Sequence, residues 1–192
     1  MHPLGQLRDI RHYRVMDDGG NDPAMAMEDQ LAAISSLGQV LDDAGIEHWL
    51  FGGWAVDFWV GEVTRPHDDI DVAAWRRDYD GIRSALLAAG WEHTPTAEDL
   101  VGTRYRKGIA DVEFSFVEAS EGGSVVVPLP TGPVTWSAEP FGDVRAHLRG
   151  VTCRTIPLAV LAEGKSRPRE GAAEGAKDRA DFEALSRLRG RA

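Results

Sequence analysis

Two aspartates, Asp69 and Asp71, stand one residue apart in the segment His67-Asp68-Asp69-Ile70-Asp71-Val72. Acidic and apolar residues alternate here, which predicts a strand on which Asp69 and Asp71 share one face. Neighbouring carboxylates repel each other, and each resists ionising unless a cation offsets the charge. Mg²⁺ prefers carboxylate, phosphate and water oxygens. The pair therefore predicts a site for a divalent metal and a phosphate.

Two glycines, Gly52 and Gly53, stand where the pattern of the chain changes from strand to helix. A short apolar run ends at Phe51, and the residues from Trp54 onward follow helical spacing. Glycine has no Cβ, so the backbone can approach a ligand closely, and the N–H groups of a helix's first turn can hold an anion. The glycine turn thus predicts a cradle for nucleotide phosphates beside the acidic strand.

These two motifs, at this spacing, resemble the nucleotidyltransferase fold of the DNA polymerase β superfamily. The runs Phe51-Gly52-Gly53-Trp54-Ala55-Val56-Asp57 and Arg65-Pro66-His67-Asp68-Asp69-Ile70-Asp71 are similar in particular to the small aminoglycoside and lincosamide nucleotidyltransferases. The resemblance implies an α+β fold in which a mixed sheet packs against helices. It also implies transfer of a nucleoside monophosphate from ATP, GTP or another NTP to a hydroxyl of an antibiotic-like small molecule, with two Mg²⁺ ions bridged by Asp69 and Asp71.

A third acid is expected from the strand-like run 109–116, because a two-metal site needs one more carboxylate to complete a metal site and accept the proton of the attacking hydroxyl. Asp111 and Glu113 share one face of this run. By resemblance the third acid lies on a strand antiparallel to the acidic strand, and Asp111 fits the family pattern better. Glu113 is the alternative, and a solvent-facing role for both is the other reading.

Four basic residues are candidates for contacts with the nucleotide phosphates. We expect His67 on the face of the two aspartates, where it contacts a phosphate or orients a carboxylate. Arg65 contacts a phosphate or forms a surface ion pair. The resemblance further implies a helix reading Lys-Asp-x-x-Asp and a lysine just upstream near the phosphates, so Lys165 and Lys177 are candidates. A solvated helical face is the alternative for both lysines.

The remaining elements are expected to surround these motifs in one domain. We expect a loose leader over residues 1–24 and a nucleotidyltransferase domain over 25–192 that is helical from about 157. Apolar spacing and turn residues predict helices over 28–44, 78–89 and 177–185, with Ala180 among the packing positions of the last, and hairpins over 100–116 and 144–156. The Gly- and Pro-rich segment 120–140 is expected to border the substrate.

The composition narrows the choice of partners. The net charge of −10 argues against a general nucleic-acid binder and suits a cationic acceptor, with a surface that only keeps the protein in solution as the alternative. Cys153 is the single cysteine, so an intramolecular disulfide cannot form, which fits a reducing cytoplasm. No apolar run is long enough to span a bilayer, so a membrane partner is not expected. An acidic rim expected near the acceptor consists of Glu118, Glu121, Glu139 and Asp143.

Two other functions compete with antibiotic modification. One is a nucleotidyltransferase toxin or regulator that modifies RNA or protein; a strongly basic face would favour RNA, and the net negative charge weakens that reading. The other is a catalytically inactive nucleotide-binding module. Loss of one acid would signal the inactive module, whereas all the acids of the pattern are present. The sequence leaves the acceptor and the oligomeric state open.

Overall fold

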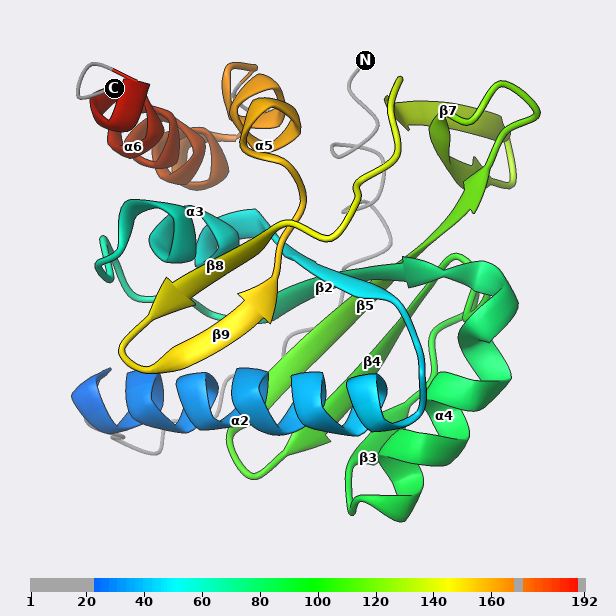
Figure 1. Ribbon diagram of the computed structural model, residues 1–192. Coiled ribbons are helices and arrows are strands. Elements are labelled where there is room, and N and C mark those ends of the chain that lie inside the picture. Colours follow the sequence, from blue (N-terminus) through cyan, green and yellow to red (C-terminus); the bar gives the residue numbers. More distant parts are fainter. Residues whose placement is uncertain (1–22, 168–170, 190–192) are drawn as a thin grey trace.

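A mixed sheet packed against helices makes up the fold, as Figure 1 shows for the computed structural model, which describes residues 23–167 and 171–189. The expected α+β class is thereby confirmed. In chain order the elements are α2 (Pro23–Asp43), β1 (His48–Phe51), α3 (Gly52–Val60), β2 (Ile70–Trp75), η1 (Arg76–Asp78), α4 (Tyr79–Ala88), β3 (Glu92–Thr94), β4 (Gly102–Lys107), β5 (Ala110–Ala119), β6 (Val125–Leu129), β7 (Gly132–Ser137), β8 (Arg145–Leu148), β9 (Val151–Arg154), α5 (Leu158–Lys165) and α6 (Ala172–Arg189).

The sheet places β2 and β5 side by side at its centre. Its main path runs β1-β2-β5-β4-β3, and β6 and β7 continue from β5. The pairs β1–β2, β3–β4 and β4–β5 are antiparallel, and the β4–β5 and β8–β9 hairpins confirm the two that the sequence predicts. The pair β2–β5 is parallel, with Asp71 opposite Glu113.

The parallel direction of β5 corrects the expectation of an antiparallel strand for the third acid. Helix α4 carries the chain from β2 to the far edge of the sheet before β3 begins. Two antiparallel pairings then follow, β3 with β4 and β4 with β5, so β5 runs in the direction of β3 and of β2. The direction of β5 is thus set by the crossover and by two reversals of the chain.

Helices cover the sheet and lie close to its central strands. Helix α2 lies along one face and contacts β5, α4 and β9 (Figure 1). Helix α3 contacts β2, α5 and α6, and α5 and α6 pack together. Helix α2 includes residues from Pro23 onward that precede the expected start at residue 28. The predicted leader over 1–24 lies outside the described residues except for Pro23 and Ala24.

Aromatic side chains pack the Gly- and Pro-rich segment against Phe51, the last residue of β1. This segment forms the β6–β7 hairpin, and Trp136 of β7 packs edge-to-face on Phe51, with ring centroids 4.9 Å apart. Phe141 packs on Trp136 and on Trp49 in the same way. Trp136 and Phe141 are both buried, so they belong to the core. Trp136 of β7 thus contacts the residue that precedes the glycine turn.

The buried face of α6 differs from the one expected. Ala180 is exposed, so its predicted packing role is wrong, whereas Leu185 is buried. Asp178 and Asp181 are buried instead of Ala180. These carboxylates can be buried because they form ion pairs with basic side chains. In the described part of the chain, no helix combines the length and apolar character that crossing a bilayer requires.

Candidate active site

The glycine turn joins β1 directly to α3. Gly52 has a φ of 70°, a left-handed conformation that side chains with a Cβ rarely adopt. A Cβ on Gly52 would overlap the carboxylate of Asp71, and one on Gly53 would come within 2.5 Å of Arg65 Nη2 and His67 Nδ1. The two glycines therefore make room for side chains from the acidic strand and from the segment that precedes it.

Three carboxylates form the acidic centre of the site. One oxygen each from Asp69, Asp71 and Glu113 lies within 4.8 Å of the other two. Asp71 is buried, and the other two are partly buried. The parallel register of β2 and β5 brings Glu113 opposite Asp71. Carboxylate oxygens that converge in this way are the donor set that suits a hard divalent cation such as Mg²⁺.

Asp111 lies outside this cluster, which corrects its expected placement. It shares a face of β5 with Glu113 but stands two residues earlier, roughly 6–7 Å further back along the strand. Its carboxylate is 45% exposed and accepts two hydrogen bonds from Arg106, at 2.7 Å and 3.0 Å. Glu113 is 16% exposed and pairs with Arg104 at 3.1 Å. Glu113, and not Asp111, therefore lies with Asp69 and Asp71 in the structure.

His67 is held inside the protein by contacts to both of its ring nitrogens. Nε2 contacts Asp57 Oδ2, Nδ1 contacts Arg65 Nη1 at 3.1 Å, and the ring lies on Trp54, with centroids 4.6 Å apart. Asp57 also accepts hydrogen bonds from the backbone and hydroxyl of Thr64, at 3.0 Å and 2.6 Å. His67 thus contacts the carboxylate of Asp57, which is not one of the three acids of the cluster.

Asp57, for which the sequence suggests only a structural role, also contacts His67. It is fully buried in α3. A sequence signal for it exists, because it is the one charged residue in the otherwise apolar run Gly52–Val60. A buried carboxylate requires hydrogen-bonding partners, and Asp57 finds them in His67 and Thr64.

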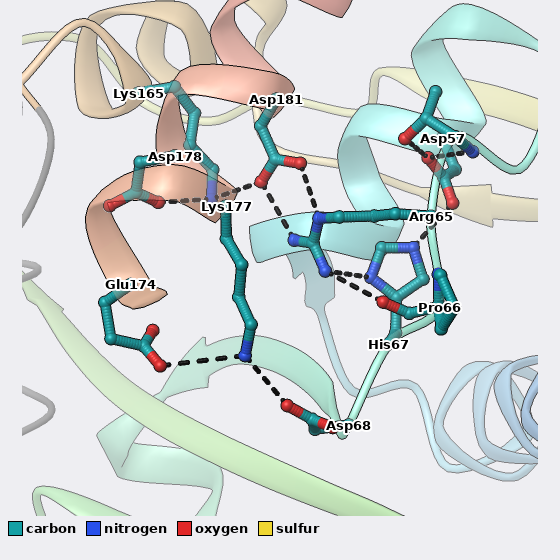
Figure 2. Close-up of polar contacts among 11 residues, drawn as sticks. Asp57, Arg65, Pro66, His67, Asp68, Lys165, Glu174, Lys177, Asp178 and Asp181 are labelled. Atoms are coloured by element: carbon teal, nitrogen blue, oxygen red, sulfur yellow. Dashed lines mark hydrogen bonds and ion pairs between the residues drawn. The ribbon is translucent and has the colours of Figure 1, made fainter. Parts of the chain in front are cut away.

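Arg65 and Lys165 meet at a buried carboxylate on α6. Arg65 donates to Asp181 from Nε at 2.9 Å and from Nη2 at 3.0 Å, and Lys165 Nζ lies 2.7 Å from the same side chain (Figure 2). Lys165 also donates to Asp178 at 3.0 Å. Burial by itself would raise the pKa of Asp181, but the hydrogen bond from Arg65 and the charge of Lys165 outweigh burial and lower it.

Lys177 lies nearer the surface on the same helix. Its Nζ donates to Asp68 at 2.9 Å and lies 3.6 Å from Glu174 (Figure 2). Asp68 immediately precedes Asp69. Arg65, which lies in the segment leading into the acidic cluster, Lys165 and Lys177 are thus each paired with a carboxylate.

Solved structures share this architecture. Lincosamide adenylyltransferase LnuA in its lincomycin-bound form matches with a TM-score of 0.62 and 17% identity, over 83% of this chain and 96% of LnuA. ANT(2'')-Ia in complex with adenylyl-2''-tobramycin matches with a TM-score of 0.58 and 16% identity, over 85% of this chain and 98% of that one. These likenesses define the fold as that of the nucleotidyltransferases.

The sequence identifies the family within this fold. The family model for aminoglycoside-2''-adenylyltransferase matches residues 33–185, and the chain belongs to that family. A 2''-aminoglycoside nucleotidyltransferase of Escherichia coli and one of Klebsiella pneumoniae are each 42% identical to it over 43 residues. That stretch is 22% of this chain and spans 24% of the relative's length. The resemblance seen in the two sequence motifs is thereby confirmed.

Proposed function

We propose that the protein is a nucleotidyltransferase that moves a nucleoside monophosphate, with ATP as the first candidate donor, to a hydroxyl of an aminoglycoside- or lincosamide-type antibiotic. The observation that carries the proposal is the convergence of Asp69, Asp71 and Glu113 at paired positions of β2 and β5. Membership of the aminoglycoside-2''-adenylyltransferase family supports it. One structural neighbour is bound to lincomycin and another is in complex with adenylyl-2''-tobramycin, and these ligands suggest the acceptor classes.

The three acids would hold the divalent metal of this reaction. Mg²⁺, when bound, neutralises charge on the phosphoryl oxygens and lowers the pKa of the acceptor hydroxyl. Glu113 is our candidate to accept the proton of that hydroxyl, because it completes the cluster from β5, the strand between β2 and β4. Two metal ions, and Mg²⁺ rather than another divalent cation, are part of the proposal.

The backbone at the start of α3 is our candidate for the triphosphate. Gly52 and Gly53 bring the first turn of α3 next to Asp71 without an intervening side chain. N–H groups at a helix N-terminus favour an anion. Contacts of Lys165 and Lys177 with the phosphates stay predictions; each would have to leave or share its carboxylate partner. Arg65 and His67 already bind protein groups, so we assign them to the support of the site.

The acidic rim supports a cationic acceptor less strongly than the sequence implies. Asp143 is paired with Arg145 and Arg154, and Glu118 is paired with Arg76. These arginines offset part of the charge that would attract amines. The proposal of an aminoglycoside acceptor therefore rests mainly on the family. Lincomycin should be tested beside it, because one structural neighbour binds lincomycin. A cytoplasmic location, where NTPs are available, is part of the proposal.

Label transfer tests the proposal. The protein is incubated with Mg²⁺ and ATP or GTP labelled at the α-phosphate, and with tobramycin, lincomycin, total RNA or a protein mixture as acceptor. We expect label on one of the antibiotics, lost when EDTA removes the metal. Label on RNA or protein and none on either antibiotic would support the toxin or regulator reading. Nucleotide binding without transfer to any acceptor would support an inactive module.

A further inference from the structure

Helix α6 contacts the segment of the chain that leads into Asp69. We call residues 61–69, between α3 and β2, the approach segment. Two side chains of α6, Lys177 and Asp181, contact this segment at Asp68 and Arg65 (Figure 2). They are four residues apart and hence on one face of the helix. The charges are complementary at both points of contact.

The contact between Arg65 and Asp181 is the stronger of the two. A guanidinium and a carboxylate that share two parallel hydrogen bonds hold each other in orientation as well as in distance. Asp181 is 1% exposed and Arg65 20%, so water screens this pair little. Lys177 and Asp68 are exposed by 35% and 47%, and exposed pairs contribute little. We therefore expect Asp181 to contribute more than Lys177 to holding the approach segment in place.

Arg65, which Asp181 binds, makes further hydrogen bonds within the approach segment. Arg65 Nη1 donates to the carbonyl of Pro66 and to Nδ1 of His67, both at 3.1 Å. A guanidinium has only donors, so Nδ1 must accept, which places the imidazole proton on Nε2. Nε2–H then donates to Asp57 of α3. Asp57 of α3 and Arg65, which Asp181 of α6 binds, thus both contact His67, two residues before Asp69.

A third helix, α2, also contacts His67. Gln30 of α2 donates from Nε2 to the carbonyl of His67 at 3.1 Å. The approach segment is thereby held from α2, α3 and α6, while Asp69 follows it directly into β2. A displacement of about 1 Å in a reacting group can reduce the rate by roughly 10²-fold. Support of this kind is what a metal ligand outside the hydrogen-bonded strand requires.

We propose that Asp181 is a positioning residue, which acts through Arg65 to set the place of Asp69 in the metal-binding cluster. The proposal rests on the proposed function, because it assumes that the cluster binds metal. It assigns a role in the site to a helix whose residues lie more than a hundred positions further along the chain. It also gives Arg65 a role in positioning Asp69 rather than in binding a phosphate.

The test compares Asp181→Asn, Arg65→Gln and the double variant with the wild type. Arg65→Lys serves as a second variant, since it keeps the charge and loses the paired hydrogen bonds. The control is Arg154→Gln, which removes another arginine that is mostly buried and ion-paired, on β9. Calorimetry with Mn²⁺ and no nucleotide gives the metal Kd, thermal melting gives Tm, and label transfer gives kcat and the KM for the nucleotide.

We expect the Mn²⁺ Kd to rise, and kcat to fall, by about 10- to 100-fold in each single variant, because Asp69 is displaced. The double variant should be no worse than the worse single variant, since both changes break one link. The nucleotide KM should stay within about threefold of the wild-type value. Arg154→Gln should lower Tm without changing the Mn²⁺ Kd.

Two results would overturn the positioning role. One is a wild-type Mn²⁺ Kd in Asp181→Asn and Arg65→Lys, measured well below their Tm. The other is a nucleotide KM that rises in the Arg65 variants and not in Asp181→Asn, because Arg65 would then bind phosphate independently. If the wild type binds Mn²⁺ but transfers no label, the proposed function fails while the comparison of Kd values still decides the inference.

Discussion

Gly52 and Asp71 fit together so closely that a Cβ on the glycine would overlap the carboxylate and lie 2.8 Å from its carbon Cγ. Gly52 is also held at a φ of 70°. One residue therefore satisfies two requirements, a left-handed turn into α3 and an open space beside an acid of the site. An experiment that separates these two requirements shows whether the open space beside Asp71 affects the affinity for the metal.

The first prediction separates them with two alanine substitutions. Gly52→Ala and Gly61→Ala both place a Cβ at a positive φ, 70° and 84°, and a Cβ on Gly61 would meet open space. Each should lower the free energy of unfolding by about 1–2 kcal/mol through the backbone alone. We expect Gly52→Ala, in addition, to weaken Mn²⁺ binding measured by calorimetry. Equal Mn²⁺ affinity in the two variants would show that the contact with Asp71 has no bearing on the metal.

The second prediction concerns Arg104, the neighbour of Glu113 across β4 and β5. Its guanidinium lies 3.1 Å from Glu113 and offsets part of the charge of the three acids. Arg104→Gln should therefore destabilise the metal-free protein and enlarge the rise in Tm that Mg²⁺ produces. Thermal melts with and without Mg²⁺ measure both effects.

Arg106→Gln is the matched control for this experiment, because Arg106 forms the corresponding pair with Asp111 outside the cluster. It should leave the Mg²⁺-dependent rise in Tm at its wild-type size. A larger rise in Arg106→Gln than in Arg104→Gln would indicate that the metal binds nearer to Asp111.

The third prediction follows from the lowered pKa of Asp181. Although burial opposes ionisation, Arg65 and Lys165 lower its pKa below the usual 3.8, so the unfolded chain binds a proton first as the pH falls. Its contribution to stability is therefore complete above about pH 3.8 and is lost as the pH falls through the lower folded-state pKa.

Asp181→Asn removes this dependence, so thermal melts as a function of pH check the prediction. The Tm of the wild type should exceed that of Asp181→Asn by a constant amount above about pH 4, and the difference should shrink at lower pH. Other carboxyl groups titrate in both proteins and cancel in the difference. A difference that widens on acidification would mean that the Asp181 carboxylate is not the ionised partner of Arg65.

The sequence predicts the local parts of the site well, because each depends on neighbouring residues. Asp69 and Asp71 lie close together as the alternation predicts, although β2 begins only at Ile70 and not at His67, and the change of period at Gly52 marks the turn from strand to helix. The β4–β5 and β8–β9 hairpins follow in the same way from short apolar runs around Gly108 and Gly150.

Contacts between distant segments are where prediction from sequence fails. Asp111 and Glu113 have the same alternation, and only the register of β5 against β2 distinguishes them. That register depends on the α4 crossover. The pairing of Arg65 with Asp181 joins residues 116 positions apart, and the pattern of α6 does not reveal that its buried face carries carboxylates.

The central claim is that Glu113, and not Asp111, completes the metal site with Asp69 and Asp71. It is tested most directly by the rate of label transfer from ATP to the best antibiotic acceptor at saturating Mg²⁺, with Glu113→Gln and Asp111→Asn as a pair. Both side chains lie on β5 and pair with an arginine of β4. We predict that Glu113→Gln lowers kcat by roughly 10²–10⁴-fold and that Asp111→Asn keeps it within about threefold. A Glu113→Gln protein with near wild-type kcat, beside an inactive Asp111→Asn, would contradict the account.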